Sequence, residues 1–303
     1  MDLSKFNKKT QMDALKKCLL VVNPIAGGND KTEIITASRA YAEAEGINLI
    51  EFETTGEDDE KSIRELYAEH RPERILVAGG DGTVKMVAEA VEHNDVVIGV
   101  LPAGSANGLS VDLKLPADLE ENLKIAFHGN VMEMDMVCIN GKKSLHLSDI
   151  GVNAELIRNY EGSAIRGKLG YALKAISTLT DLDDPFRATI VANGETIETE
   201  ARMVVIANTQ KYGTGVTINP IGIMDDGKFE IVILKSLDVL LIGKILTGNM
   251  PVDNVEDIVI ISTEQALITT NVPVCFQIDG EFCGEEDRLD VKILHRQMRV
   301  AIP

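Results

Sequence analysis

The strongest constraint on the fold is an alternation of short apolar runs with helical patterns over the first third of the chain. Four runs are short, rich in β-branched residues and almost continuously apolar: Cys18–Val22, Ile47–Phe52, Arg74–Ala78 and Val96–Leu101. Stretches of helical character separate them, over Lys31–Glu45, Asp58–His70 and Thr83–His93. Runs without polar alternation predict strands that are covered on both faces. The strand–helix–strand order therefore predicts an α/β domain built on a doubly wound parallel sheet.

The apolar pattern changes to a period of two residues after about residue 115 and a helix that ends near His128. Alternation over 132–138 predicts a half-buried strand, and Asn193-Gly194 favours the positive φ angles of a tight hairpin turn. Further strands are predicted over Arg187–Ala192, Thr196–Ala201, Met203–Ala207, Phe229–Leu234, Ala266–Thr270, Val274–Ile278, Leu289–Leu294 and Arg299–Ile302, with one helix over Gly167–Leu179. We therefore predict two domains: residues 1–115 as the α/β domain and residues 116–303 as an all-β, sandwich-like domain.

The charge balance limits the partners of the chain. It carries 30 Lys and Arg against 48 Asp and Glu, and this net charge of −18 argues against general nucleic-acid binding. No apolar stretch reaches the roughly 20 residues of a membrane-spanning helix, and four scattered cysteines predict reduced thiols in a cytoplasmic protein. The lysine-rich start, Lys5 to Lys17, is either a local basic contact for a membrane or an exposed helix or frayed arm.

Glycine-rich and polar loops follow each of the four predicted N-terminal strands. They read Asn23-Pro24-Ile25-Ala26-Gly27-Gly28, Thr54-Thr55-Gly56, Gly79-Gly80-Asp81-Gly82-Thr83 and Pro102-Ala103-Gly104-Ser105-Ala106-Asn107-Gly108. In open α/β sheets, ligands bind outside the carboxyl ends of the strands. The coincidence of four such loops therefore predicts a ligand site at this edge of the sheet.

The loop from Gly79 to Thr83 is the most informative of the four. Its three glycines allow the backbone to approach a ligand, and the following helix N-terminus favours phosphate. A carboxylate such as Asp81 repels phosphate unless a cation joins them, which favours Mg²⁺ held between Asp81 and a polyphosphate. The alternative is a glycine-rich turn in which Asp81 caps a helix, and the spacing alone does not decide between the two.

Each of two acidic turns in the second domain is either a structural turn or part of a functional site. Asp279-Gly280-Glu281 is typical of a type I′ hairpin turn, and it also places two carboxylates at a strand end. Asp225-Asp226-Gly227 is either a turn before the next strand or an oxygen-rich cation site.

Taken in order, these motifs resemble the diacylglycerol-kinase catalytic-domain superfamily of lipid kinases, which includes bacterial diacylglycerol kinases and sphingosine kinases. The resemblance runs from about Leu19 to Pro303. Its motifs are Asn23-Pro24 with Gly27, Gly79–Thr83, Pro102-x-Gly104-Ser105-x-Asn107, Leu169-Gly170-Tyr171, Tyr212-Gly213-x-Gly215 with Pro220, Asp225-Asp226-Gly227 and Asp279-Gly280-Glu281. The glycine–aspartate loop alone is shared with NAD kinases and phosphofructokinases, so the ordered set carries the resemblance.

The resemblance implies an ATP- and Mg²⁺-dependent lipid kinase that phosphorylates a hydroxyl of diacylglycerol or a related lipid alcohol at the membrane surface. ATP would contact Asn23, Thr54, Gly79, Gly80, Asp81, Gly82, Thr83, Ser105 and Asn107. Asp81 would bind the catalytic Mg²⁺, and Glu281 would be the general base for the acceptor hydroxyl. Asp226 would bind a structural Mg²⁺ with backbone carbonyls near Ile223 and Lys228. The family pattern also allows the final strand to return to the first domain, and it is compatible with a homo-oligomer.

The chain departs from the family pattern at a few positions near these motifs. Gly108 stands where many members have Asp, Lys85 where many have Asn, and Thr214 interrupts a glycine triplet. Asp81 and Glu281 are both present, which favours activity. Two other functions are considered: a kinase for a soluble substrate, of the NAD-kinase type, and a non-catalytic nucleotide-binding regulatory protein.

Overall fold

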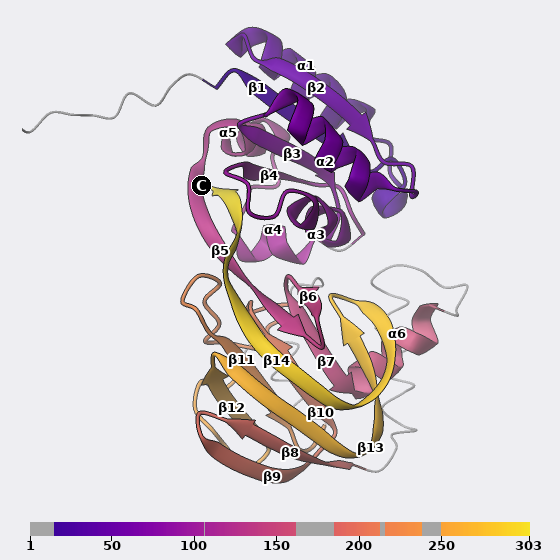
Figure 1. The fold of residues 1–303 in the computed structure, drawn as a ribbon, viewed down its shortest axis with the longest axis vertical. Coiled ribbons are helices and arrows are strands. Elements are labelled where there is room, and N and C mark those ends of the chain that lie inside the picture. Colours follow the sequence, from indigo (N-terminus) through magenta and orange to yellow (C-terminus); the bar gives the residue numbers. More distant parts are fainter. Residues whose placement is uncertain (1–14, 106, 162–184, 213–215, 238–249) are drawn as a thin grey trace, which may run out of the picture.

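The computed structural model describes residues 15–105, 107–161, 185–212, 216–237 and 250–303, arranged as an α/β unit above a β-rich unit (Figure 1). The α/β unit contains β1 (Lys17–Val22), β2 (Asn48–Glu53), β3 (Arg74–Gly79) and β4 (Val97–Pro102). These strands pair in parallel in the order β4-β3-β1-β2. The predicted doubly wound parallel sheet is therefore confirmed, and its strand limits differ from the predicted ones by one residue.

Helices cover both faces of this parallel sheet because each helix has one apolar face. α2 (Asp59–His70) and α3 (Asp81–Ala90) bury Ile63 and Val84 in the core on one face. α1 (Thr32–Glu45) and α5 (Leu119–His128) bury Ala42 and Phe127 in the core on the other face. The short elements η2 (Ala26–Gly28) and α4 (Gly108–Asp112) lie in the loops that follow β1 and β4.

The second unit is antiparallel and β-rich, as the period of two predicts. Its elements are β5 (Asn130–Ile139), β6 (Lys142–Ser144), β7 (Leu147–Gly151), α6 (Val152–Glu161), β8 (Phe186–Ala192), β9 (Glu195–Ala201), β10 (Met203–Ala207), β11 (Phe229–Leu234), β12 (Ile258–Thr263), β13 (Gln265–Ile278) and β14 (Glu281–Ile302). The β8–β9 hairpin turns at Asn193-Gly194, where both residues have positive φ angles.

The last strand, β14, connects the two units. It pairs with β13 near its start and with β5 along much of its length, and it ends beside β4, where Arg299 is in register with Val97 (Figure 1). β4 and β14 run parallel, so β14 extends the α/β sheet. This strand therefore connects the turn that carries Glu281 to the parallel sheet of the α/β unit.

Several sequence predictions for the second unit were wrong or incomplete. β13 and β14 are each one long strand where the sequence predicts two, because the irregular registers at 269–274 and 294–298 bend a strand without ending it. The predicted solvent face of β5 is buried at Asp135, whose carboxylate accepts hydrogen bonds from the backbone N–H groups of Gly227 and Arg296. β6, β7, β12 and α6 were not predicted. The predicted helix Gly167–Leu179 lies outside the described residues.

Within the described ranges, no helix is both long enough and apolar enough to cross a membrane.

Candidate active site

The loop after β3 packs too closely to admit a side chain at its first position. A Cβ on Gly79 would lie 2.6 Å from the Thr83 Cβ and 2.7 Å from its Oγ1. Thr83 is buried, and its Oγ1 accepts a hydrogen bond of 3.0 Å from Nδ2 of Asn23 in the loop after β1. The hydroxyl keeps its own proton for donation to another acceptor. Two strand-end loops are therefore tied together at the N-terminus of α3.

The loops after β1 and β4 are held together in the same way. Gly27 has a φ of 64°, and a Cβ there would lie 2.7 Å from the carbonyl oxygen of Ala103. Asn107 closes its own loop, because Oδ1 accepts from the Gly104 N–H at 2.8 Å and Nδ2 donates to the Gly104 carbonyl at 3.1 Å. Both ends of the Asn107 amide thus bond within the loop, and the exposed Ser105 lies beside it.

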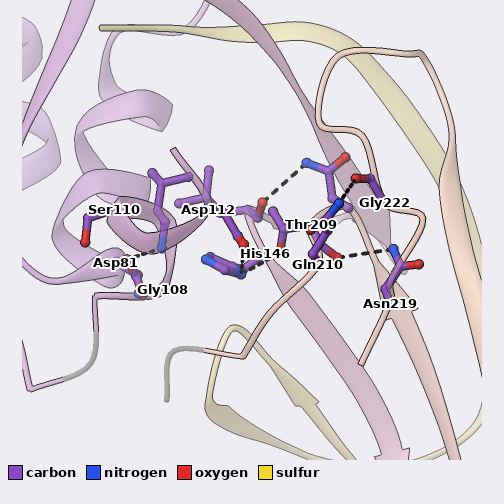
Figure 2. A network of polar contacts seen from close by, with 12 residues as sticks. Asp81, Gly108, Ser110, Asp112, His146, Thr209, Gln210, Asn219 and Gly222 are labelled. Carbon is purple, nitrogen blue, oxygen red and sulfur yellow. Dashed lines mark hydrogen bonds and ion pairs between the residues drawn. The ribbon is translucent and has the colours of Figure 1, made fainter. Parts of the chain in front are cut away.

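Asp81, the first residue of α3, faces the N-terminus of α4. Its Oδ2 accepts from the Gly108 N–H at 2.8 Å and its Oδ1 from the Leu109 N–H at 3.2 Å (Figure 2). Burial raises the pKa of the Asp81 carboxyl, and the nearby His146 and these two N–H groups act in the opposite direction. Asp81 therefore does cap a helix, but the helix is α4 and not the one that it begins.

A buried polar network joins α4 to the second unit next to Asp81 (Figure 2). The Nδ1 of His146 lies 2.7 Å from the Thr209 hydroxyl and 3.8 Å from Oδ2 of Asp112, the last residue of α4. Burial raises the pKa of the Asp112 carboxyl, and His146 opposes that rise. Asn219 extends the network by donating to the Thr209 carbonyl at 3.2 Å. The wall of the site behind Asp81 is therefore built from both units.

A cavity of about 700 Å³ opens at the ends of β1 and β2, where the sequence predicts a ligand site. Its lining includes four predicted nucleotide contacts: Asn23, Thr54, Gly82 and Thr83. Gly79, Gly80, Asp81, Ser105 and Asn107 are not among the lining residues. Sequence reasoning missed the contribution of α2, which adds Asp59, Lys61 and Arg64. The signal was available, since α2 begins soon after the end of β2 and must start at this edge of the sheet.

The turn between β13 and β14 brings Glu281 to the glycine–aspartate loop of the first unit. Asp279 and Gly280 have φ angles of 51° and 89°, as a type I′ turn requires. The Glu281 Oε1 lies 3.9 Å from the position that a Cβ on Gly82 would occupy. The two sequence interpretations of Asp279-Gly280-Glu281 are therefore compatible: the residues form a hairpin turn, and the turn carries a carboxylate into the site.

Asp279 anchors this turn and does not project into the site. Its carboxylate accepts from the Ser144 hydroxyl at 3.0 Å, the Leu145 N–H at 2.9 Å and the His146 N–H at 2.8 Å. Oδ2 also lies 3.1 Å from Nζ of Lys85 on α3. The side chain of Asp279 is only 6% exposed, so these groups surround it.

Gln277 and the buried Asp149 hold the same turn from within the second unit. The Gly280 N–H donates to Oε1 of Gln277 at 2.7 Å, and Nε2 of Gln277 donates to Oδ2 of Asp149 at 2.5 Å. The same Oδ2 accepts from Asn153 at 2.6 Å and from the Tyr212 hydroxyl at 3.0 Å. Burial raises the pKa of Asp149 to about 6 against the effect of these donors. Sequence reasoning missed Asp149, because an isolated Asp in an apolar stretch gives no spacing signal.

We expect Asp149→Asn to make the stability of the protein less dependent on pH. A carboxyl whose pKa rises on folding from 3.8 to about 6 contributes stability that is full below pH 3.8 and is lost as pH rises through 6. Asn keeps an acceptor for the three donors and does not titrate. Between about pH 5 and pH 7.5, the free energy of unfolding of the variant should therefore gain about 1 kcal/mol over that of the unsubstituted protein. Urea unfolding of both proteins at pH 5 and pH 7.5 measures this. If the difference in free energy of unfolding between the two proteins were the same at both pH values, the prediction would be contradicted.

No cluster of three or more His, Cys, Asp or Glu side chains suited to a metal occurs in the part of the chain that the structure describes. Asp226 is exposed, and its Oδ1 accepts from the Lys228 N–H at 3.0 Å. Asp81 lies apart, at the N-terminus of α4. A metal at either place would therefore depend on backbone carbonyls, water or a bound phosphate for its other ligands.

Comparisons with known proteins agree with this architecture. Residues 17–139 match the family model described as diacylglycerol kinase catalytic domain, and residues 148–301 match the YegS C-terminal NAD kinase beta sandwich-like domain. The diacylglycerol kinase of Bacillus subtilis is 25% identical over 298 residues, which are 95% of this chain and 97% of that protein. A Salmonella arizonae protein named probable lipid kinase YegS is 28% identical over 240 residues, covering 76% of this chain and 78% of that protein.

A solved structure of a diacylglycerol kinase from Bacillus anthracis has the same fold. It superposes with a TM-score of 0.74 at 21% identity and covers 95% of this chain and 97% of that chain. Two family models thus match consecutive parts of the chain, and the fold is shared over nearly its whole length. The chain belongs to the family of diacylglycerol and YegS-like lipid kinases, in which a diacylglycerol kinase catalytic domain precedes a β sandwich-like domain.

Proposed function

We propose that this lipid kinase transfers the γ-phosphate of ATP, with Mg²⁺, to a hydroxyl of diacylglycerol or a related lipid alcohol. The observation that carries the proposal is the position of Glu281, whose Oε1 lies 3.9 Å from the Cβ position of Gly82 in the glycine–aspartate loop. A carboxylate from one unit thus faces a phosphate-type loop of the other. Phosphoryl transfer to a hydroxyl needs this pairing of a phosphate site and a proton acceptor.

The cavity beside this loop fits a nucleotide. Its volume of about 700 Å³ is within the usual range for small-molecule sites, and the N-terminus of the ten-residue helix α3 opens into the same region. The Thr83 hydroxyl and the Asn23 amide are polar groups on its wall that can bind phosphate or ribose oxygens. On the α2 side, Lys61 and Arg64 stand beside Asp58, Asp59 and Glu60, and Arg64 pairs with Glu60, so this side of the cavity carries charges of both signs.

At Asp81, Mg²⁺ would be a nucleotide-bound ion, because the protein groups that contact this carboxylate are the N–H groups of Gly108 and Leu109, which do not bind cations. Magnesium is usually held by one or two carboxylates together with phosphates and water, so Asp81 needs no protein cage around it. When bound, Mg²⁺ neutralises charge on the transferring phosphoryl group. Asp81 would hold this ion directly or through water, and Asp226, with the carbonyls of Ile223 and Lys228, would hold a second, structural ion.

Each unit has a separate task in this mechanism. The α/β unit orients the nucleotide through Asn23, Thr54 and Thr83. The β-rich unit, which begins with β5, binds the lipid alcohol and presents Glu281, which accepts the proton of the attacking hydroxyl. The substrate lies in membranes, so the protein would act at a membrane surface as a peripherally associated cytoplasmic enzyme.

Transfer from γ-labelled ATP with Mg²⁺ into a total bacterial lipid extract tests the proposal. We expect label in the organic phase after phase separation, in a product that co-migrates with a phosphorylated lipid alcohol. Label in the aqueous product when NAD is supplied would instead support a kinase of the NAD-kinase type. ATP binding without transfer to either acceptor would support a nucleotide-binding regulatory protein.

A further inference from the structure

An ion pair crosses from the nucleotide-facing unit to the turn that carries Glu281. The Nζ of Lys85 on α3 lies 3.1 Å from Oδ2 of Asp279, and the two side chains are 21% and 6% exposed. Lys85 follows Asp81 by four residues, so both project from one face of α3. This face therefore carries both the carboxylate at the N-terminus of α4 and the cation that contacts the hairpin turn.

The contact reaches a turn that is rigid on its other side. Asp279 accepts three further hydrogen bonds, from Ser144, Leu145 and His146, and Gly280 is tied to Gln277. A displacement of the Asp279 carboxylate therefore displaces the whole turn. Glu281 is two residues further along, so its place relative to Gly82 depends on where the turn is held.

We propose that Lys85 is a positioning residue that sets the distance between the Glu281 carboxylate and the glycine–aspartate loop through its ion pair with Asp279. The proposal rests on the proposed function, because it concerns the same catalytic turn. Lys85 is not among the residues that line the cavity, and its ion-pair partner is Asp279. Its effect on transfer is through geometry, and misplacement of a reacting group by about 1 Å can lower a rate about a hundredfold.

A second ion pair across the same interface offers a matched control. Nζ of Lys143 on β6 lies 2.6 Å from Oε2 of Glu92, which follows α3, and the side chains are 18% and 30% exposed. This pair joins the same two units, but Lys143 pairs with Glu92 and not with Asp279; its contact with the turn is indirect, through the neighbouring Ser144, which donates to Asp279. It therefore contributes to the interface without a direct ion pair to the turn.

The experiment compares Lys85→Met, Lys85→Arg and Lys143→Met in the full chain. The first readout is amide hydrogen exchange in the peptide that spans residues 277–283. We expect Lys85→Met to raise exchange there severalfold, Lys85→Arg to restore most of the protection and Lys143→Met to leave it unchanged. Equal exchange in Lys85→Met and the unsubstituted protein would overturn the proposal, as would equal increases in the two methionine variants.

The second readout is steady-state transfer to the lipid acceptor. We expect Lys85→Met to lower kcat about tenfold to a hundredfold with the KM for ATP within about twofold, and Lys143→Met to keep kcat within about twofold. A rise in the KM for ATP with kcat unchanged would overturn the positioning role. If the unsubstituted protein phosphorylates no lipid, the proposed function fails, and hydrogen exchange still decides whether Lys85 holds the turn.

Discussion

Glu281→Gln should lower kcat for lipid phosphorylation by about a hundredfold to ten-thousandfold while ATP binding stays intact. The change removes the carboxylate that the β13–β14 turn presents to Gly82 and keeps the size of the side chain. General-base catalysis contributes a factor of this order. Glu281 is an exposed residue of the turn, so the free energy of unfolding should change by less than about 0.5 kcal/mol.

The matched control for this variant is Glu286→Gln, the same chemical change five residues further along β14. It should leave kcat and the KM for ATP unchanged. Calorimetric titration with a non-hydrolysable ATP analogue separates binding from transfer in all three proteins. Full activity of Glu281→Gln would remove Glu281 from the mechanism, and equal losses in both variants would point to a general effect on β14.

The sequence predicts the α/β unit well because β1, β3 and β4 are buried on both faces; β2, at the edge of the sheet, is only partly buried, although its apolar run predicted burial there too. Strands such as β1 and β3 are therefore largely apolar, and glycine stands at or soon after their ends where another segment packs closely against the backbone. Gly79 and Gly27 show this, since a Cβ at either would collide with Thr83 or Ala103. At these positions the local sequence pattern and the tertiary packing both require glycine, so the positions can be predicted from the sequence.

The β-rich unit is harder to predict because its long strands change environment along their length. β14 begins at an exposed turn, bends between Leu294 and Met298, and ends inside the α/β sheet, so no single period describes it. Buried polar residues add to the difficulty. Asp149 and Asp135 interrupt apolar stretches and are tolerated only because distant segments supply hydrogen-bond donors.

The sequence predicted individual residues of the candidate site but not how the fold brings them together. The family resemblance pointed to Asp81 and Glu281, whose local spacing alone did not decide their roles, and only the fold shows that β13 and β14 bring Glu281 to Gly82. The two departures at Gly108 and Lys85 also gain a physical meaning, since Gly108 donates its N–H to Asp81 and Lys85 pairs with Asp279. The third departure, Thr214, lies outside the described residues.

Asp81→Asn should separate stability from activity. Burial already raises the pKa of this carboxyl, so removing its charge relieves an unfavourable desolvation. The amide oxygen can keep the 2.8 Å bond from the Gly108 N–H, while the Leu109 N–H at 3.2 Å loses its acceptor, at a cost of about 1 kcal/mol. The two effects oppose each other, and we expect the free energy of unfolding to stay within about 1 kcal/mol of that of the unsubstituted protein.

The activity of Asp81→Asn should nevertheless fall at least about a hundredfold, because a neutral amide cannot hold Mg²⁺ against the nucleotide phosphates as a carboxylate does. The affinity for ATP should also lose its dependence on Mg²⁺, which titrations with and without the ion measure. Ser110→Ala is the control, since it removes the 2.8 Å bond to the Asn107 carbonyl and loosens the start of α4 without changing charge. If Ser110→Ala lost as much activity, the role of Asp81 would be to place α4. If Asp81→Asn kept both its rate and its Mg²⁺ dependence, the ion would be held elsewhere.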